Sequence, residues 1–285
     1  MLEQQIANSL VLGSIYALCA LGFTLLFGVA KIINFAYGEL LMFGAFFTLT
    51  TMNFMKVGFF LALPFAMLIL AAFSVLIYLV TIRPVLRGTP LQSLLVTTGV
   101  LYVLHELAII IWGTEPRQMD MGIEGAIEFG AVIVTYPRLI AIGTMLLLVL
   151  ILYWMLYKLR IGKALRAVAQ NRAGAEAIGL NVNRVICFAF AVSGAMACAA
   201  GALIGALYAT EPSMGGAPLL KSFVIVILGG LGNVFGAIVG GLLIGIAETL
   251  TGSYISYAFK DVFTFLIMIF ALILRPNGLL GGRNQ

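Results

Sequence analysis

The chain has 285 residues, of which 62% are hydrophobic and only 9% charged, and its mean hydropathy is +1.14. Soluble domains have roughly 45–50% apolar and about 25% charged residues, so these values exclude a water-soluble fold. The net charge of +5 comes from basic residues in short loops beside apolar segments, which indicates topology determinants rather than a nucleic-acid partner. Since no polar block is long enough to fold alone, we predict one all-α transmembrane domain over residues 1–285.

A spanning helix needs about 20 mainly apolar residues, because its backbone must form all its hydrogen bonds internally in hydrocarbon. The segments that meet this requirement are 5–29, 33–52, 58–82, 91–112, 139–157, 185–208, 234–250 and 257–274. Segment 219–230 is apolar but short and runs into glycine-rich residues 229–233. The first segment is too long for a signal peptide, so we expect it to be retained. We predict a polytopic helix bundle of eight to nine spans with broken helices.

The distribution of Lys and Arg over the loops predicts how the chain is oriented in the membrane. Loop 158–184 carries six basic residues and one acidic residue, whereas residues 113–138 carry four acidic and two basic residues. Since cytoplasmic loops are enriched in Lys and Arg, loop 158–184 is predicted to be cytoplasmic and 113–138 external. The N-terminus is then outside and the C-terminus cytoplasmic, provided that 219–230 crosses fully as a broken helix, which we favour. The basic residues that this counting places inside are Arg83, Arg87, Arg275 and Arg283.

Two files of small residues predict close helix packing near the C-terminus. One has a glycine at every fourth residue and the other runs beside it: Gly232, Gly236 and Gly240; Ala237, Gly241 and Gly245. The pattern leaves open whether they face another helix of this chain or a partner subunit.

The cytoplasmic loop is the only sizeable polar segment that we place inside the cell. Residues 163–173 are rich in good helix formers, and Gly174 is expected to separate a second short turn that Gly179 ends as a C-cap. A thin apolar stripe runs through both parts: Leu165, Val168, Ala175 and Ile178. It suits a short helix lying on another protein, but a solvated or headgroup-bound loop fits equally well.

Ionisable residues inside the membrane cost roughly 2.5–3.5 kcal/mol near a helix centre, so each is a candidate for the translocation pathway. Glu39 is the strongest, because Asn34, Tyr37 and Gly38 interrupt the apolar run before it. Backbone groups freed by such a break line a cavity or are buried in protein. Alternatively, Glu39 reaches the cytoplasmic interface or pairs with Lys31.

Other polar residues give weaker signals. His105 and Glu106 point about 100° apart on a helix, so at most one of them faces a given pathway. Glu248, and the adjacent Lys260 and Asp261, could anchor a helix at the interface or pair with one another. The region around Asn233 resembles that around Asn34, as expected for paired broken helices at a pathway. The pathway candidates are therefore Asn34, Tyr37, Gly38, Glu39, Asn233 and Glu248.

The sequence offers little for catalysis. It has one His, no phosphate-binding loop, no Ser-centred elbow and no Cys/His cluster with metal-ligand spacing. Cys19, Cys187 and Cys198 lie in apolar runs and are expected to be packing residues. We predict a transport subunit that is not an enzyme and holds no cofactor. Energy for active transport would come from another chain or from an ion gradient.

Seven motifs follow one another along the chain: 13–18 (GSIYAL), 20–28 (ALGFTLLFG), 33–40 (INFAYGEL), 83–87 (RPVLR), 162–171 (GKALRAVAQN), 175–181 (AEAIGLN) and 275–281 (RPNGLLG). Together they resemble the branched-chain amino acid permeases of bacterial ABC importers over nearly the whole chain. The resemblance implies an inner-membrane heterodimer with a second related permease, two cytoplasmic ATPase subunits that bind ATP, and an external substrate-binding protein.

The resemblance also implies that residues 166–179 are a coupling element seated in a groove of an ATPase. The residues expected to make this contact are Arg166, Gln170, Asn171, Ala175, Glu176 and Gly179. Many other ABC permeases have Glu-Ala-Ala before a glycine, and here only Glu176, Ala177 and Gly179 match that pattern.

Three functions remain open. The first is import of branched-chain or related aliphatic amino acids. The second is import of urea or short amides, because urea permeases share most of these motifs. The third, from a different class, is an ion-coupled carrier with Glu39 or Glu248 as its proton site.

Overall fold

The structure is a computed structural model that describes residues 2–86, 88–129, 132–275 and 278–280. Arg87 and Arg283, used above to predict orientation, and part of motif 275–281 lie outside the described residues. Within the described residues, eight helical stretches are long and apolar enough to cross a membrane, which confirms a polytopic helical bundle. The helix that corresponds to the predicted span 33–52 is not one of these eight. The long helices are α1 (Leu2–Ala30), α2 (Tyr37–Met55), α3 (Phe59–Ile77), α5 (Pro90–Trp112), α6 (Tyr136–Lys158), α9 (Val182–Leu207), α10 (Gly216–Gly229), α11 (Val234–Tyr254) and α12 (Lys260–Leu274).

Short elements connect these helices. A π-helical turn η1 (Tyr78–Ile82) and α4 (Arg83–Val85) continue α3, and α7 (Arg160–Gln170) and α8 (Arg172–Ala177) join α6 to α9. The 3₁₀ turns η2 (Pro212–Gly215) and η3 (Tyr257–Phe259) precede α10 and α12. Strands β1 (Ala126–Phe129) and β2 (Val132–Thr135) pair as an antiparallel hairpin before α6.

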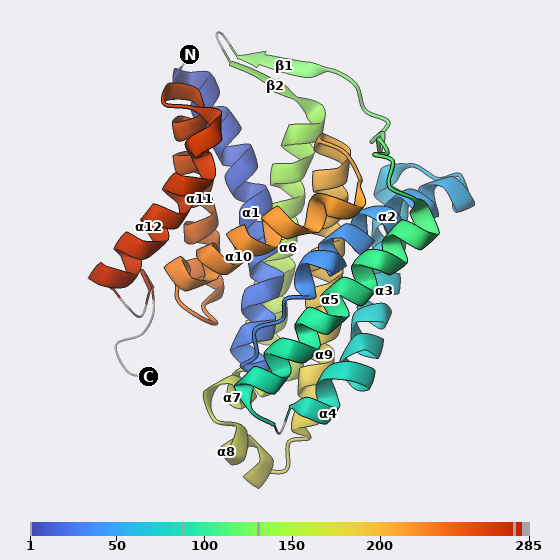
Figure 1. Cartoon of the computed structure of the whole chain (residues 1–285), viewed down its shortest axis with the longest axis vertical. Helices are drawn as coiled ribbons and strands as arrows, with labels where there is room; N and C mark the ends of the chain where they lie inside the picture. Colours follow the sequence, from blue (N-terminus) through green and yellow to red (C-terminus); the bar gives the residue numbers. More distant parts are fainter. Residues whose placement is uncertain (1, 87, 130–131, 276–277, 281–285) are drawn as a thin grey trace.

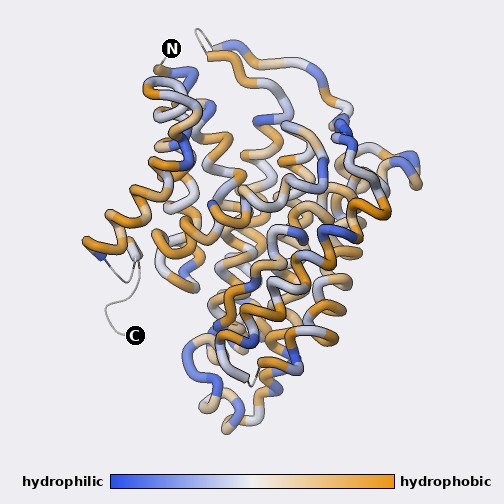
Figure 2. Tube along the Cα trace, viewed as in Figure 1, coloured by the Kyte–Doolittle hydropathy of each residue, from blue (hydrophilic) through white to orange (hydrophobic). Residues whose placement is uncertain are grey.

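The core of the bundle lies around α1, α2 and α9. Helix α1 packs along α11 and α9, and α2 packs between α3 and α9. Helix α2 is buried over most of residues 37–49 and exposed at its C-terminal end, whereas α5, α6 and α12 keep long rows of exposed apolar side chains. In Figure 2 the outer helices are mainly hydrophobic, and hydrophilic residues gather around α7–α8 and along the segment at the opposite end. This distribution is typical of a bundle whose sides face lipid or another apolar partner.

The two polar ends of the molecule carry the two loops that predicted its orientation. Figure 1 shows α7 and α8 at one end, and the hairpin with the N-terminus at the other. The expectation of a purely helical chain missed this hairpin. Its strands have only four residues each, and the side chain of Gln4 in α1 bonds the backbone N–H and C=O of Ile133 in β2, at 2.7 and 2.9 Å. That long-range contact has no local sequence signal.

The first predicted break lies between α1 and α2. Helix α1 ends at Ala30, residues 31–36 are not helical, and α2 begins at Tyr37, so the span predicted from residue 33 starts four residues too early. The Asn34 side chain accepts a hydrogen bond from the Ala36 N–H at 3.1 Å, and the Asn34 carbonyl accepts one from Tyr37 at 3.2 Å. Asn side chains favour such turns over helix, which explains the break.

The second break separates α10 from α11. Helix α10 has only 14 residues, or about 21 Å of rise, but η2 extends it toward the hairpin end. There Thr210 pairs with Arg117 through two backbone hydrogen bonds of 2.8 and 2.9 Å. At its other end, Gly232 lies against Gly28, close to the end of α1. Residues Pro212–Gly229 together are long and apolar enough to cross a membrane, and the full crossing stays a prediction.

The glycine files pack against two helices of the same chain. A methyl group at Gly241 would lie 2.6 Å from the Ala17 Cα, and one at Gly245 would overlap the backbone of Gly13, both in α1. Gly236 and Gly240 instead meet the backbone of α10. The prediction was wrong for Gly232, which precedes α11, has a φ of +82° and belongs to the turn. One file thus lies on α1 and the other on α10.

Gly245→Ala is expected to lower the free energy of unfolding by about 1–3 kcal/mol, because the added methyl group overpacks the α1–α11 contact. Gly143→Ala in α6 is the matched control, since a methyl group there meets nothing within 4 Å and alanine favours helix. Equilibrium unfolding in mixed detergent measures both. Equal stability of the two variants would contradict the close approach.

Candidate functional site

The α7–α8 loop is amphipathic, but its apolar stripe faces the bundle. Leu165, Val168 and Ala175 are all buried against this chain's own helices, while Ile178 is 75% exposed. The interpretation of the stripe as a surface for another protein is therefore wrong for its first three residues. They hold the loop on the membrane domain, because α7 packs against α1, α6 and α9.

The helix break in this loop lies at Asn171 and not at the predicted Gly174. Asn171 has extended backbone angles, and its side chain accepts a hydrogen bond from the Gly174 N–H at 2.9 Å, which caps α8. Gly179 ends the turn as predicted, with a φ of +84°. The Leu180 N–H donates to the Ala175 carbonyl, and the Gly179 N–H donates to the Glu176 carbonyl, both at 3.0 Å. These two bonds form a Schellman motif.

The residues predicted to contact an ATPase divide into an exposed and a supporting group. Gln170, Asn171, Glu176 and Gly179 are exposed on the α7–α8 surface. Ala175 is buried and supports α8 from below. The guanidinium of Arg166 lies 4.6 Å from the centre of the Tyr157 ring, so it ties α7 to α6.

Asn171→Ala is expected to lower the stability of helix α8 by about 1 kcal/mol, because it removes the side chain that caps its N-terminus. Amide hydrogen exchange of residues 172–177 would then accelerate about fivefold. Asn183→Ala, at an exposed position in the first turn of α9, is the control and should leave this exchange unchanged. Unaltered exchange in the Asn171 variant would show that the cap does not stabilise α8.

Glu39 is buried, and its carboxylate faces α5. The His105 Nδ1 lies 3.5 Å from the Glu39 Oε2, which itself has no hydrogen-bond partner among the described residues. Glu106 is exposed, so only one of the two adjacent residues faces Glu39, as predicted. Lys31, the partner considered from the sequence, lies in the break after α1, and the ion pair that the structure gives for Glu39 is with His105.

Asn34, Tyr37 and Gly38 are buried inside the bundle. The Tyr37 hydroxyl donates to the Cys19 carbonyl at 2.9 Å, and its ring packs on Phe23. A methyl group at Gly38 would lie 2.8 Å from the Gly215 carbonyl oxygen, so the start of α2 meets the junction of η2 and α10 in the interior. These residues build the crossing of two broken helices.

Glu248 belongs to a buried ionic cluster that joins α10, α11 and α12. The Lys221 Nζ lies 2.6 Å from the Glu248 Oε1, 2.7 Å from the Tyr16 hydroxyl and 3.3 Å from the Asp261 Oδ1. The Lys260 Nζ lies 3.4 Å from the same Glu248 oxygen and donates to the Tyr257 hydroxyl at 2.9 Å. Of the pairings considered from the sequence, the structure gives Lys260 with Glu248, whereas Asp261 pairs with Lys221, which the sequence analysis did not consider.

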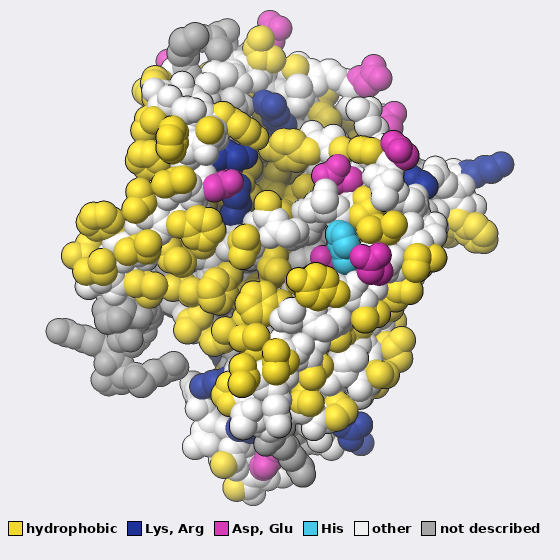
Figure 3. All heavy atoms as spheres, in the orientation of Figure 1, with side chains coloured by type: hydrophobic (Ala, Val, Ile, Leu, Met, Phe, Trp, Pro, Cys, Tyr) yellow, Lys and Arg dark blue, Asp and Glu magenta, His cyan; other side chains and the backbone are white. Residues whose placement is uncertain are grey.

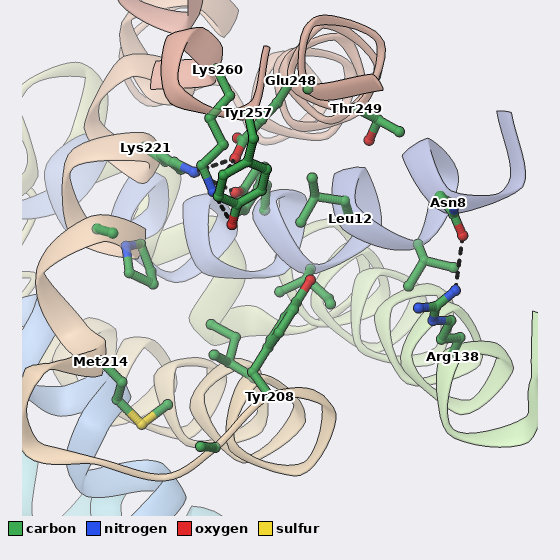
Figure 4. Close-up of a pocket in the computed structure, with 18 of the residues that line it drawn as sticks. Asn8, Leu12, Arg138, Tyr208, Met214, Lys221, Glu248, Thr249, Tyr257 and Lys260 are labelled. Atoms are coloured by element: carbon green, nitrogen blue, oxygen red, sulfur yellow. Dashed lines mark hydrogen bonds and ion pairs between the residues drawn. The ribbon is translucent and has the colours of Figure 1, made fainter. Parts of the chain in front are cut away.

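This cluster forms one wall of a cavity of about 710 Å³ at the hairpin end. Figure 4 shows Lys221, Glu248 and Lys260 on one side, Arg138 and Asn8 on another, and Tyr208 between them. The Arg138 Nη1 donates to the Asn8 Oδ1 at 2.9 Å. In Figure 3, basic and acidic side chains lie beside a hollow that also has hydrophobic side chains around it. The remaining walls are mainly apolar.

The six pathway candidates do not gather at one place. Glu39 lies at the α2–α5 contact and Glu248 at the cavity. Asn233 lies at the α7 end, where its side chain caps α11 by accepting from the Gly236 N–H at 3.1 Å and donates to the Leu280 carbonyl at 2.8 Å. Asn34 and Asn233 thus both mark breaks but have different local roles.

The family model described as "Branched-chain amino acid transport system / permease component" matches residues 5–272. This match spans nearly the whole bundle, including the α7–α8 loop and the ionic cluster. The chain belongs to this permease family.

Relatives of the permease match it almost end to end. It is 34% identical to the high-affinity branched-chain amino acid transport system permease protein LivH of Escherichia coli, over 98% of this chain and 95% of that protein. It is 31% identical to BraD of Pseudomonas aeruginosa, with the same coverage. LivM of Salmonella typhimurium is 26% identical over 93% of this chain and 68% of that protein.

Sequence reasoning missed two partners in the permease. Lys221 lies inside an apolar segment, so the rule that selected Glu39 and Glu248 applied to it as well. His105 was considered only beside Glu106, and only the fold shows that α5 crosses α2 at Glu39. The signal for Lys221 was therefore in the sequence, whereas nothing in the sequence indicated the contact between His105 and Glu39.

Proposed function

We propose that this permease is the membrane subunit of an ATP-binding-cassette importer that moves branched-chain amino acids into the cell. The observation that supports this most is the end-to-end similarity to LivH and BraD, whose names give that transport role. ATP is bound and hydrolysed by separate subunits, and this chain supplies half of the pathway. The membrane is the cell inner membrane.

We infer that the α7–α8 loop faces the cytoplasm and contacts an ATPase, while the N-terminus and the hairpin face outside. The loop leads directly into α6 on one side and α9 on the other. Helix α9 packs against α1, α2 and α3. A force applied to α8 by a moving ATPase therefore reaches the centre of the bundle through α9.

The other partners follow from the surface and the relatives. A second, related permease would cover part of the apolar surface of the outer helices, and the similarity to LivM supports such a pairing of related chains. Two ATPase subunits would bind at the α7–α8 end. An external substrate-binding protein would dock at the hairpin end.

Reconstitution of the assembled importer in proteoliposomes tests this function. ATP-driven uptake of L-leucine is expected when the second permease, the ATPases and the binding protein are all present. Uptake of urea in place of leucine would overturn the substrate. Uptake by this chain alone, abolished by an uncoupler and indifferent to ATP, would show an ion-coupled carrier instead.

A further inference from the structure

We propose that the cavity beside the Lys221–Glu248 pair binds a free aliphatic amino acid as a zwitterion, within this single chain. The inference rests on the proposed function and adds a binding site to it. The cavity lies at the hairpin end, which we place outside, so it would hold the substrate before translocation. Its chemistry supplies three things that such a ligand requires: an acceptor for an ammonium group, donors for a carboxylate, and apolar walls.

The acceptor is the second carboxylate oxygen of Glu248. This side chain is only 4% exposed, and its Oε1 already meets both Lys221 and Lys260. Its Oε2 is buried and has no hydrogen-bond partner among the described residues, although Glu248 lines the cavity. An unpartnered buried carboxylate oxygen is costly, and a ligand ammonium group would satisfy it.

The donors come from Lys260 and Arg138. The three donors of the Lys221 ammonium are all engaged, by Tyr16, Glu248 and Asp261. Lys260 has two partners, which leaves one of its three donors for a ligand. Arg138 lies on another wall (Figure 4) and uses one of its five donors on Asn8. A carboxylate between these two residues would accept hydrogen bonds from both.

The apolar walls suit an aliphatic side chain. They are formed by Leu12 and Ile15 of α1, Ile204 of α9 and Met214 of η2. The volume of about 710 Å³ falls within the range of roughly 300–1,000 Å³ that is usual for small-molecule sites. A ligand with opposite charges at one end and a branched apolar chain at the other matches this arrangement.

The competing explanation is that the cluster only holds α10, α11 and α12 together. The two explanations, a ligand site and a purely structural ionic cluster, differ in whether they require Glu248 alone or both Glu248 and Asp261. Asp261 also pairs with Lys221, but it is exposed and does not line the cavity. A purely structural cluster requires both carboxylates to hold the helices together, whereas ligand binding requires Glu248 and not Asp261.

Protection from alkylation tests the site in the assembled importer. Thr249, which lines the cavity, is replaced by cysteine in a background without Cys19, Cys187 and Cys198, and is labelled with a membrane-impermeant maleimide. L-Leucine is expected to slow the labelling. Isopentylamine, which lacks the carboxylate, and 4-methylpentanoate, which lacks the ammonium group, are expected not to slow it. Equal protection by all three compounds, or no protection by leucine, would overturn the proposal.

Two variants and one control complete the test. Glu248→Gln and Arg138→Gln are each expected to raise the leucine concentration needed for half-protection by about tenfold or more, since each removes a charge-assisted hydrogen bond. Asp261→Asn should leave it unchanged. Unchanged half-protecting leucine concentrations in both Arg138→Gln and a folded Glu248→Gln would overturn the site. If Glu248→Gln does not fold, an unchanged concentration in Arg138→Gln alone would overturn it. Wild-type leucine uptake without protection would reject the site and leave the importer function standing.

Discussion

Replacing Ile178 with aspartate is expected to abolish ATP-driven uptake while the membrane domain remains folded. Ile178 is 75% exposed at the end of α8, and nothing in the described bundle covers it. In the proposed assembly it would be buried in an ATPase groove, where a charge without a partner typically costs about 2–4 kcal/mol of binding energy. That cost corresponds to about a 30-fold or greater loss of affinity.

Binding of the purified ATPase subunits to the permease pair and leucine uptake are measured side by side. Ile178→Leu should retain both activities, because it keeps an apolar side chain of the same volume. Ile123→Asp is the matched control for ATPase binding, since Ile123 is an exposed isoleucine near the hairpin, at the opposite end from α8. Normal ATPase binding by Ile178→Asp would remove α8 from the docking surface.

Lys221→Met is expected to destabilise the folded protein by about 3 kcal/mol, which is the second large effect. Lys221 and Glu248 are 10% and 4% exposed at a distance of 2.6 Å, and removing one partner leaves the other charge buried. Breaking a buried ion pair from one side costs about 3–5 kcal/mol. The low end of this range applies because Lys260 remains 3.4 Å from Glu248.

A double-mutant cycle measures this coupling. The variant that combines Lys221→Met with Glu248→Gln should recover most of the lost stability, because no buried charge remains uncompensated. Unfolding in mixed detergent gives the four free energies. Additive losses in the two single variants would mean that the pair contributes nothing beyond its separate side chains.

The sequence predicted the architecture well, because hydropathy decides which segments cross a membrane. Most spans and the two breaks were read from composition, and the orientation that loop charge predicts stays a prediction. The limits lie in features that depend on distant residues. The hairpin depends on Gln4, which is more than 120 positions away from the strand it bonds. A further limit is local, because hydropathy does not detect the turn that the Asn34 side chain closes with the Ala36 N–H, and the start of α2 was therefore predicted four residues too early.

The functional residues were predicted less completely. The α7–α8 loop and Glu248 were singled out as candidates, and the structure places four of the six candidate loop residues on an exposed surface. Ala175 and the apolar stripe faced inward, because the amphipathic pattern cannot tell a partner from the chain's own bundle. Tyr37 and Gly38 interrupt the apolar run for packing reasons, which a linear pattern does not distinguish from a pathway.

Cross-linking from α8 tests the central claim most directly, namely that an ATPase in the cytoplasm contacts this helix. A cysteine in place of Glu176, in the assembled importer, is predicted to cross-link to an ATPase subunit through a short bifunctional maleimide, with a yield that changes when ATP is added. A cysteine in place of Glu124, which is exposed at the hairpin end, should give no such product. An ATPase product from position 124, or labelling of position 176 by an impermeant reagent added outside intact cells, would contradict the account.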